Sequence, residues 1–218
     1  MEQNNQTILS IKNLYIKAGE LDLIKDYNLE LKAGEYKVIS APTGTGKTTL
    51  FNYIAGVLPE QNFTVTGQIQ KAPGLKVSYA FQEPRLIPSI SVLKNVMLPL
   101  ENKTDIQRAE SVARVWLERF KLSHKIQDFP TSLSGGEQQR TNLARAFAYA
   151  NIGTSEATPV VSEALEDLHK LLLLDEPFAS QDEQNAQNIL SLIKETLLLP
   201  ETAVLIITHD RTFLMQNS

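Results

Sequence analysis

Three short apolar segments, each followed by polar residues, constrain the fold of this chain most strongly. Residues 171–174 and 204–207 are unbroken apolar runs, as is typical of strands buried on both faces of a parallel sheet. A third such strand is expected at 36–40. The polar residues that follow these strands are a loop with Gly44, Gly46 and Lys47, the pair Asp175 and Glu176, and His209. Because ligands bind at the carboxyl ends of parallel strands, the three sets are predicted to meet at one sheet edge.

The loop after residue 40 has the composition of a phosphate site. Small residues at Gly44 and Gly46 let backbone N–H groups curl around phosphate oxygens, and a helix expected at 48–55 points its partial positive charge at them. Lys47 supplies a full charge for the β- and γ-phosphates, and the Thr48 hydroxyl can ligate Mg²⁺. This combination predicts a nucleotide site.

The residues after the other two strands suit hydrolysis of that nucleotide. Asp175, at the end of an apolar strand, is suited to a water-mediated hold on Mg²⁺. Glu176 could accept a proton from an attacking water, and His209 could contact the γ-phosphate or orient that water. Taken singly, such residues are more often solvated or packed. Their position beside the Lys47 loop favours a functional role.

The rest of the chain predicts an antiparallel β lobe before the parallel sheet and a helical subdomain inserted at about 84–150. The expected elements are strands at 8–11, 27–31, 65–70 and 76–80, helices at 92–98 and 106–120, a loop at 151–158 and a short helix at 160–170. A length of 218 residues fits one domain with an inserted lobe.

Composition excludes some classes of protein. The net charge of −4 gives no reason to expect a nucleic-acid partner. The chain has no cysteine, which excludes disulfides and thiolate chemistry and suits a reducing cytoplasm. Its polar start lacks the pattern of a secretory signal, and its apolar runs are far shorter than the roughly 20 residues that cross a bilayer.

A second anion site is predicted at the start of another helix. Ser134 and Glu137 form the pattern of a capping box, which marks a helix N-terminus. Gly135 and Gly136 leave the amide N–H groups there bare of side chains. Two phosphate-binding helix starts in one chain suggest that each of two chains closes over the nucleotide of the other.

The run Leu133-Ser134-Gly135-Gly136-Glu137-Gln138-Gln139-Arg140 resembles the ABC signature motif, and nearly the whole chain resembles the ATPase domain of ABC transporters. The resemblance implies an α/β P-loop NTPase fold with a mostly parallel core sheet, an N-terminal antiparallel β lobe and an inserted α-helical subdomain. It also implies that residues 1–218 form one domain, with an insertion at 151–170.

The resemblance also implies a role for each matching residue. ATP would be bound by Ala41, Pro42, Thr43, Gly44, Thr45, Gly46, Lys47, Thr48 and Thr49 of Walker A, by Ser134, Gly135, Gly136 and Glu137 of the signature, by Asp182 of the D-loop, and by Tyr15 stacking on adenine. Hydrolysis would use Glu176, His209, Gln82 and Lys47, and Mg²⁺ would be held by Thr48, Gln82 and Asp175.

Four features depart from the family pattern. Ala41 replaces the usual first glycine of Walker A, and Gln181 replaces the usual leucine of the D-loop. The span from Ser134 to Asp175 is longer than usual, which is the reason to expect the insertion. Few residues follow His209, so either the fold tolerates an early end or the chain is incomplete.

The implied partners are a second cassette (identical or a close paralogue), transmembrane permease subunits and, for an importer, a substrate-binding protein. The chain would then lie in the cytoplasm at the inner face of the membrane. Residues 81–88 are similar to importers of the nitrate, sulfonate and taurine type, whereas residues 95–100 are similar to lipoprotein-releasing and macrolide exporters. Import is favoured. A soluble ABC protein is the further alternative, although the chain has neither a long coiled coil nor a second cassette.

Overall fold

The computed structural model describes residues 6–40, 44–151, 169–199 and 201–209. Its strands are β1 (Thr7–Ala18), β2 (Leu21–Lys32), β3 (Tyr36–Ile39), β4 (Phe63–Lys71), β5 (Lys76–Ala80), β6 (Lys170–Asp175) and β7 (Thr202–Ile207). Its α-helices are α1 (Lys47–Ala55), α2 (Val92–Met97), α3 (Ile106–Arg119), α4 (Gly135–Asn151) and α5 (Glu183–Leu197). Short 3₁₀ turns lie at Glu60–Asn62, Leu98–Leu100, Ser123–Lys125 and Pro130–Ser132. Among these residues, no helix has the length and apolar character that crossing a membrane requires.

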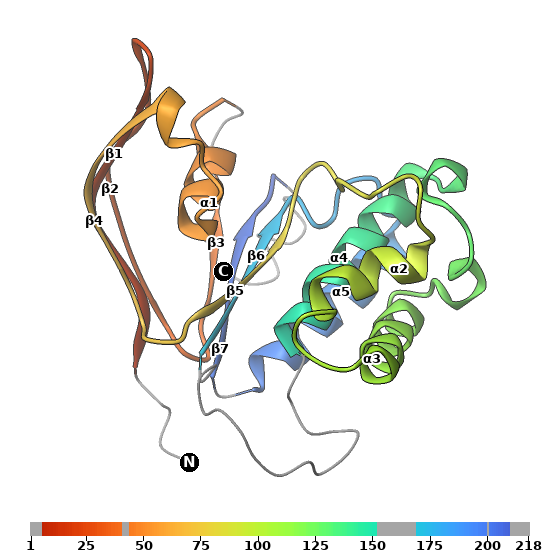
Figure 1. Ribbon diagram of the computed structural model, residues 1–218. Helices are drawn as coiled ribbons and strands as arrows, with labels where there is room; N and C mark the ends of the chain where they lie inside the picture. Colours follow the sequence, from red (N-terminus) through yellow and green to blue (C-terminus); the bar gives the residue numbers. More distant parts are fainter. Residues whose placement is uncertain (1–5, 41–43, 152–168, 200, 210–218) are drawn as a thin grey trace.

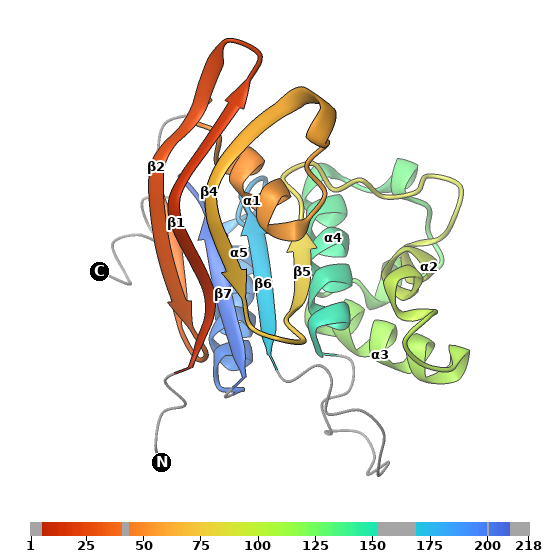
Figure 2. The same cartoon turned by 60° about the vertical axis from the view of Figure 1, so that its left-hand side comes forward.

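Two sheets form the frame of the molecule, with α1 between them (Figure 1). The first is antiparallel, with strand order β2-β1-β4, and the second has the order β3-β7-β6-β5 with every neighbouring pair parallel. Figure 2 shows the long, curved strands of the first sheet lying across the second. The predicted antiparallel lobe and parallel core sheet are both confirmed.

The two central strands of the parallel sheet, β6 and β7, contain unbroken apolar runs because both of their faces are covered. Leu172 and Leu174 of β6 pack into one core with the helices α2 to α5. Leu171 and Leu173, which alternate with them, pack into a second core with α1 and the antiparallel sheet. Side chains on a strand point alternately to opposite faces, so burial on both sides requires an apolar residue at every position.

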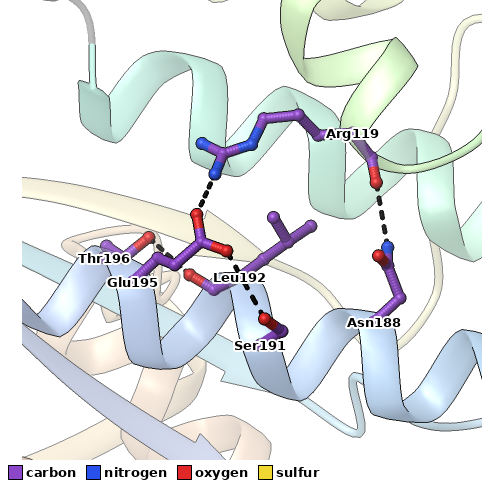
Figure 3. A network of polar contacts seen from close by, with 6 residues as sticks. All are labelled: Arg119, Asn188, Ser191, Leu192, Glu195 and Thr196. Carbon is purple, nitrogen blue, oxygen red and sulfur yellow. Dashed lines mark hydrogen bonds and ion pairs between the residues drawn. The ribbon is translucent and has the colours of Figure 1, made fainter.

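The helices α2 to α5 form a layer on the far side of the parallel sheet from α1 (Figure 1). The end of α3 is joined to α5 by polar contacts, which Figure 3 shows at close range. Asn188 donates to the carbonyl of Arg119 at 2.9 Å, and the Arg119 guanidinium is ion-paired with Glu195. This ion pair is partly exposed, so we expect the buried aromatic residues nearby to contribute more to stability.

Phe147 is the centre of an aromatic cluster with Trp116 and Phe120, and we expect its truncation to destabilise the subdomain strongly. It is fully buried in α4, with its ring centroid 5.2 Å from Trp116 and 5.3 Å from Phe120. Phe147→Ala should lower the free energy of unfolding by about 3–5 kcal/mol, measured by urea titration. A loss below about 1 kcal/mol would show that the cluster is not part of the core.

Two element ends correct the predictions for the segment 151–170. Asn151 is the last residue of α4 and not part of a loop, and Lys170 is the first residue of β6 and not part of a helix. The helix continues because its apolar face, which includes Ala148 and Ala150, stays buried to its end. The rest of the predicted loop, helix and insertion, at 152–168, lies outside the described residues. No helix begins before Val92 in the subdomain predicted from residue 84.

Candidate active site

The three predicted strand ends do meet. In the parallel sheet β7 lies between β3 and β6, so the loop after β3 and the residues after β6 and β7 share one edge. A cavity of about 490 Å³ lies there. It is lined by Leu23, Gly44, Gly46, Lys47, Thr48, Thr49, Gln82, Asp175, Glu176, Ala179, Ile207 and His209.

The loop that opens α1 depends on a left-handed backbone at Gly46. This residue is the N-cap of the helix with φ of 80°, a region that favours glycine. A Cβ added to it would lie 2.7 Å from the carbonyl oxygen of Leu23, so β2 also requires glycine there. Three of the nine predicted Walker A residues, Ala41, Pro42 and Thr43, lie outside the described residues.

Gly44 and Gly46 offer a matched pair for testing this loop. Gly44 also has a positive φ, of 83°, but a Cβ there would meet nothing within 4 Å. Gly44→Ala should weaken ATP binding about tenfold through backbone strain alone. Gly46→Ala should weaken it by at least a further factor of about ten because it also collides with β2. Equal affinities of the two variants, measured by calorimetry, would contradict the role given to this contact.

Asp175 is held at the end of β6 by two hydroxyl groups. Thr48 Oγ1 donates to its Oδ2 at 2.8 Å, and the Tyr79 hydroxyl donates to the same oxygen at 3.4 Å. Within the described part of the chain, the buried Oδ1 accepts no hydrogen bond. Burial raises the pKa of this carboxyl and the Glu176 charge adds to the rise, whereas the two hydroxyls and Lys47 oppose it.

These groups have the chemistry of a site for a hard cation. Magnesium takes oxygen ligands and is usually bound through one or two carboxylates together with substrate phosphates. The Thr48 hydroxyl and the unpartnered Oδ1 of Asp175 match that requirement. The described residues hold no cluster of three or more His, Cys, Asp or Glu side chains that could bind a metal without the nucleotide.

Glu176 and His209 contact each other across the ends of β6 and β7. Glu176 has φ of 49°, and its backbone N–H donates to the carbonyl of Ile207 at 2.8 Å. Its Oε1 lies 3.4 Å from His209 Nε2, and its Oε2 accepts from the backbone N–H of His209 at 3.3 Å. The carboxylate and the imidazole that the sequence predicted for catalysis are therefore neighbours in one cavity.

The predicted second anion site has the expected local structure. Ser134 Oγ accepts from the backbone N–H of Glu137 at 3.3 Å, and Glu137 Oε2 accepts from that of Ser134 at 2.8 Å, which completes a capping box. The hydrogen bond from the Ser134 backbone N–H is the largest of the effects that lower the pKa of Glu137 below its usual value. Ser134, Gly135, Gly136 and Glu137 are not among the residues that line the cavity.

Gln181, which departs from the family pattern, ties the predicted D-loop, residues 179–182, to α4 of the same chain. Its Oε1 accepts from Arg140 Nη1 at 2.9 Å, and its Nε2 donates to the carbonyl of Gly136 at 3.2 Å. The two segments lie so close that a Cβ on Gly136 would be 2.7 Å from the carbonyl oxygen of Ser180. Asp182 caps α5, where its Oδ1 accepts from the Asn185 backbone at 2.8 Å.

The structure brings Gln82 to the cavity but not Tyr15. Tyr15 lies in β1 between two buried residues and donates its hydroxyl hydrogen bond to Asp22, and it does not line the cavity. Its role with adenine stays a prediction.

Sequence reasoning missed two residues of the site, Leu23 and Tyr79. A polar Tyr79 hydroxyl near the carboxyl end of a strand was a usable signal, whereas nothing in the sequence marks Leu23.

A phosphate loop at the end of a parallel strand, a buried Asp near its hydroxyl and a Glu–His contact together define a nucleotide-hydrolysing P-loop protein. Comparison with known families shows which family of P-loop proteins the chain belongs to. The ABC transporter family matches residues 24–151, and the chain belongs to that family as an ATP-binding subunit with ATPase activity.

Similar proteins support the assignment over nearly the whole chain. The aliphatic sulfonates import ATP-binding protein of Nocardia farcinica is 36% identical over 203 residues, which cover 93% of this chain and 71% of that protein. The lipoprotein-releasing system ATP-binding protein of Hydrogenovibrio crunogenus is 34% identical, with coverage of 86% and 79%. A dimeric ATP-binding cassette in a post-hydrolysis state, bound to ADP and phosphate, has a TM-score of 0.76 and 27% identity, with coverage of 94% and 89%.

Proposed function

We propose that this chain works as one of a pair of identical or closely related cassettes that bind two ATP molecules between them. The observation that carries the proposal is a separation within one chain. Lys47, Glu176 and His209 line one cavity, whereas the capped helix start at Ser134 lies outside it. A second chain could bring its own helix start to the open side of that cavity. The dimer of the similar ADP-bound cassette supports this arrangement.

Hydrolysis is proposed to proceed by attack of water on the γ-phosphorus. Glu176 accepts a proton from the water while the bond from the γ-phosphorus to the bridging oxygen breaks and ADP leaves. His209, 3.4 Å from the carboxylate, orients Glu176 and the γ-phosphate relative to each other. Lys47 and the loop amides, with the backbone amides of Gly135 and Gly136 from the partner, balance the phosphate charge, because those of Ser134 and Glu137 already donate within the capping box.

Mg²⁺ fits this site and is proposed as the second requirement of the reaction. Thr48 and Asp175 would hold it together with Gln82, which lines the same cavity. When bound, the ion would neutralise charge on the phosphate oxygens. The unpartnered, buried Oδ1 of Asp175 supports the assignment because a buried carboxylate oxygen normally has a partner.

The proposed transport direction is import, with permease subunits that hold the chain at the inner face of the membrane. The sulfonate-import relative supports this direction, as does the similarity of residues 81–88 to importers. Export or lipoprotein release is the second candidate, supported by the lipoprotein-releasing relative and by residues 95–100.

The transporter assignment is tested by purification from native membranes. Affinity-tagged chain should be recovered with a multi-span membrane protein, and a substrate-binding protein that depends on the same complex would support import. Recovery of the chain from the soluble fraction alone, as a dimer without membrane partners, would overturn the transporter assignment. It would leave the ATPase assignment intact.

A further inference from the structure

Three polar side chains on one face of α4 link the loop after β6, which carries Glu176, to the loop that carries Gln82. Gln139, Asn142 and Arg145 are spaced three residues apart, so neighbouring members contact each other on the helix surface. Gln139 is 3% exposed and Asn142 is fully buried. The Arg145 guanidinium is also largely removed from water, and this burial lowers its pKa to about 10. Such burial of polar groups requires that each finds partners.

At one end, these side chains hold the backbone of Glu176. Gln139 Nε2 donates to the carbonyl of Glu176 at 3.3 Å, and Gln139 Oε1 accepts from Asn142 Nδ2 at 3.3 Å. At the other end they hold the Gln82 loop. Asn142 Nδ2 donates to the carbonyl of Phe81 at 2.7 Å, directly before Gln82.

Arg145 continues the same chain of hydrogen bonds. Its Nη2 donates to Asn142 Oδ1 at 3.0 Å and to the carbonyl of Pro84 at 2.6 Å, and its Nη1 donates to that of Arg85 at 3.2 Å. Every polar atom of the fully buried Asn142 side chain is therefore engaged. Asn142 is the one member of the group that contacts both of the others.

The two backbone segments that this group joins share a strained conformation. Glu176 has φ of 49° and Arg85 has φ of 47°, and neither is glycine. Residues other than glycine are disfavoured in this region and persist there only where the surrounding structure holds them. Gln139 binds the carbonyl of the first and Arg145 binds that of the second. The hydrogen-bonded group is thus placed to maintain both strained loops.

We propose that Asn142 is a positioning residue for ATP hydrolysis, which fixes Gln82 and Glu176 relative to each other through Gln139 and Arg145. Asn142 does not line the cavity and acts through the backbone of the two loops. The proposal rests on the proposed roles of Glu176 and Gln82. Because α4 begins at the signature residues Gly135 and Gly136, the same rigid helix also carries the surface offered to the partner cassette.

The matched control is Asn95, the other fully buried asparagine among the described residues. Its side chain also binds loop backbone, with Nδ2 donating to the carbonyls of Ile87 and Ile90 at 3.1 and 3.2 Å. Asn95→Ala and Asn142→Ala therefore remove similar buried hydrogen bonds from the same subdomain. Only Asn142 contacts the residue next to Gln82. Both variants are assayed well below their unfolding midpoints.

Asn142→Ala should lower kcat about 10- to 100-fold with the affinity for ATP changed less than about threefold, since small displacements of reacting groups have effects of this size. Its amide hydrogen exchange should rise in the segments around 81–86 and 175–178. Asn95→Ala should keep kcat within about twofold of wild type and leave those segments unchanged. Asn142→Asp keeps the acceptor for Arg145 but loses both donated bonds and places a carboxylate oxygen against two acceptor oxygens, so kcat should stay as low as in Asn142→Ala.

Equal losses of kcat in Asn142→Ala and Asn95→Ala would overturn the proposal, since that result reports general destabilisation. Unchanged kcat in Asn142→Ala would overturn it as well, whether or not exchange rises. The control for the underlying assignment is Glu176→Gln, measured in parallel. If that variant hydrolyses ATP normally, the proposed function fails independently of the exchange results for Asn142.

Discussion

Replacing Glu176 by glutamine is expected to slow ATP hydrolysis about 10²–10⁴-fold while ATP still binds, because the amide cannot accept the proton of the attacking water. The substitution changes little else. Glutamine has nearly the same size as glutamate, and its carbonyl oxygen can still accept the hydrogen bond from the His209 backbone, 3.3 Å from Oε2. The backbone contact of residue 176 with Ile207 is also untouched.

The measurement is steady-state phosphate release together with ATP affinity from calorimetry. Glu118→Gln is a suitable control, since Glu118 is an exposed acid on α3. The control should hydrolyse ATP at the wild-type rate. Turnover by Glu176→Gln within about threefold of wild type would remove Glu176 from the role of base, because even a modest general base contributes far more than that.

Gly135→Asp is expected to weaken ATP-dependent pairing of two chains by about 100-fold or more, without loss of ATP binding to the chain's own loop. The proposed partner contact places this helix start against the phosphates, and like charges across an interface cost several kcal/mol. The fold of the single chain should be preserved, because a carboxylate at a helix N-terminus interacts favourably with the helix dipole.

Gly135→Ala separates the effect of charge from the effect of size. A Cβ at this position meets nothing nearer than Ser180 Oγ at 4.0 Å, so alanine fits within the chain. We expect this variant to pair far better than Gly135→Asp. Pairing of the aspartate variant at wild-type ATP concentrations, measured by analytical ultracentrifugation, would count against a site shared between two chains.

The sequence predicted the parts of this structure that follow from local chemistry. Unbroken apolar runs indicated strands buried on both faces, and the residues after them were therefore expected to share one edge, which the cavity confirms. The spacing of Ser134 and Glu137 likewise predicted a capping box, and both of its hydrogen bonds are present. In each case, neighbours along the chain determine the outcome.

Contacts between distant segments could not be predicted in this way. Gln139, Asn142 and Arg145 look like ordinary polar residues of a helix, and only the packing of α4 against the sheet shows that they bind two distant loops. Gln181 was noted only as a departure from the family pattern, although its side chain has partners in α4. The Tyr15 side chain is oriented by its hydrogen bond to Asp22, which lies in the neighbouring strand β2. Tertiary structure determines all of these contacts.

The central claim is that two chains complete each other's ATP sites, and the mass of the Glu176→Gln variant with and without ATP tests it most directly. This variant should hold ATP unhydrolysed, so the closed state should accumulate. We predict a monomer of 24.3 kDa without ATP and, with saturating ATP and Mg²⁺, a dimer of twice that mass containing two ATP molecules. A chain that binds one ATP and remains monomeric at saturating ATP and Mg²⁺ would contradict the claim.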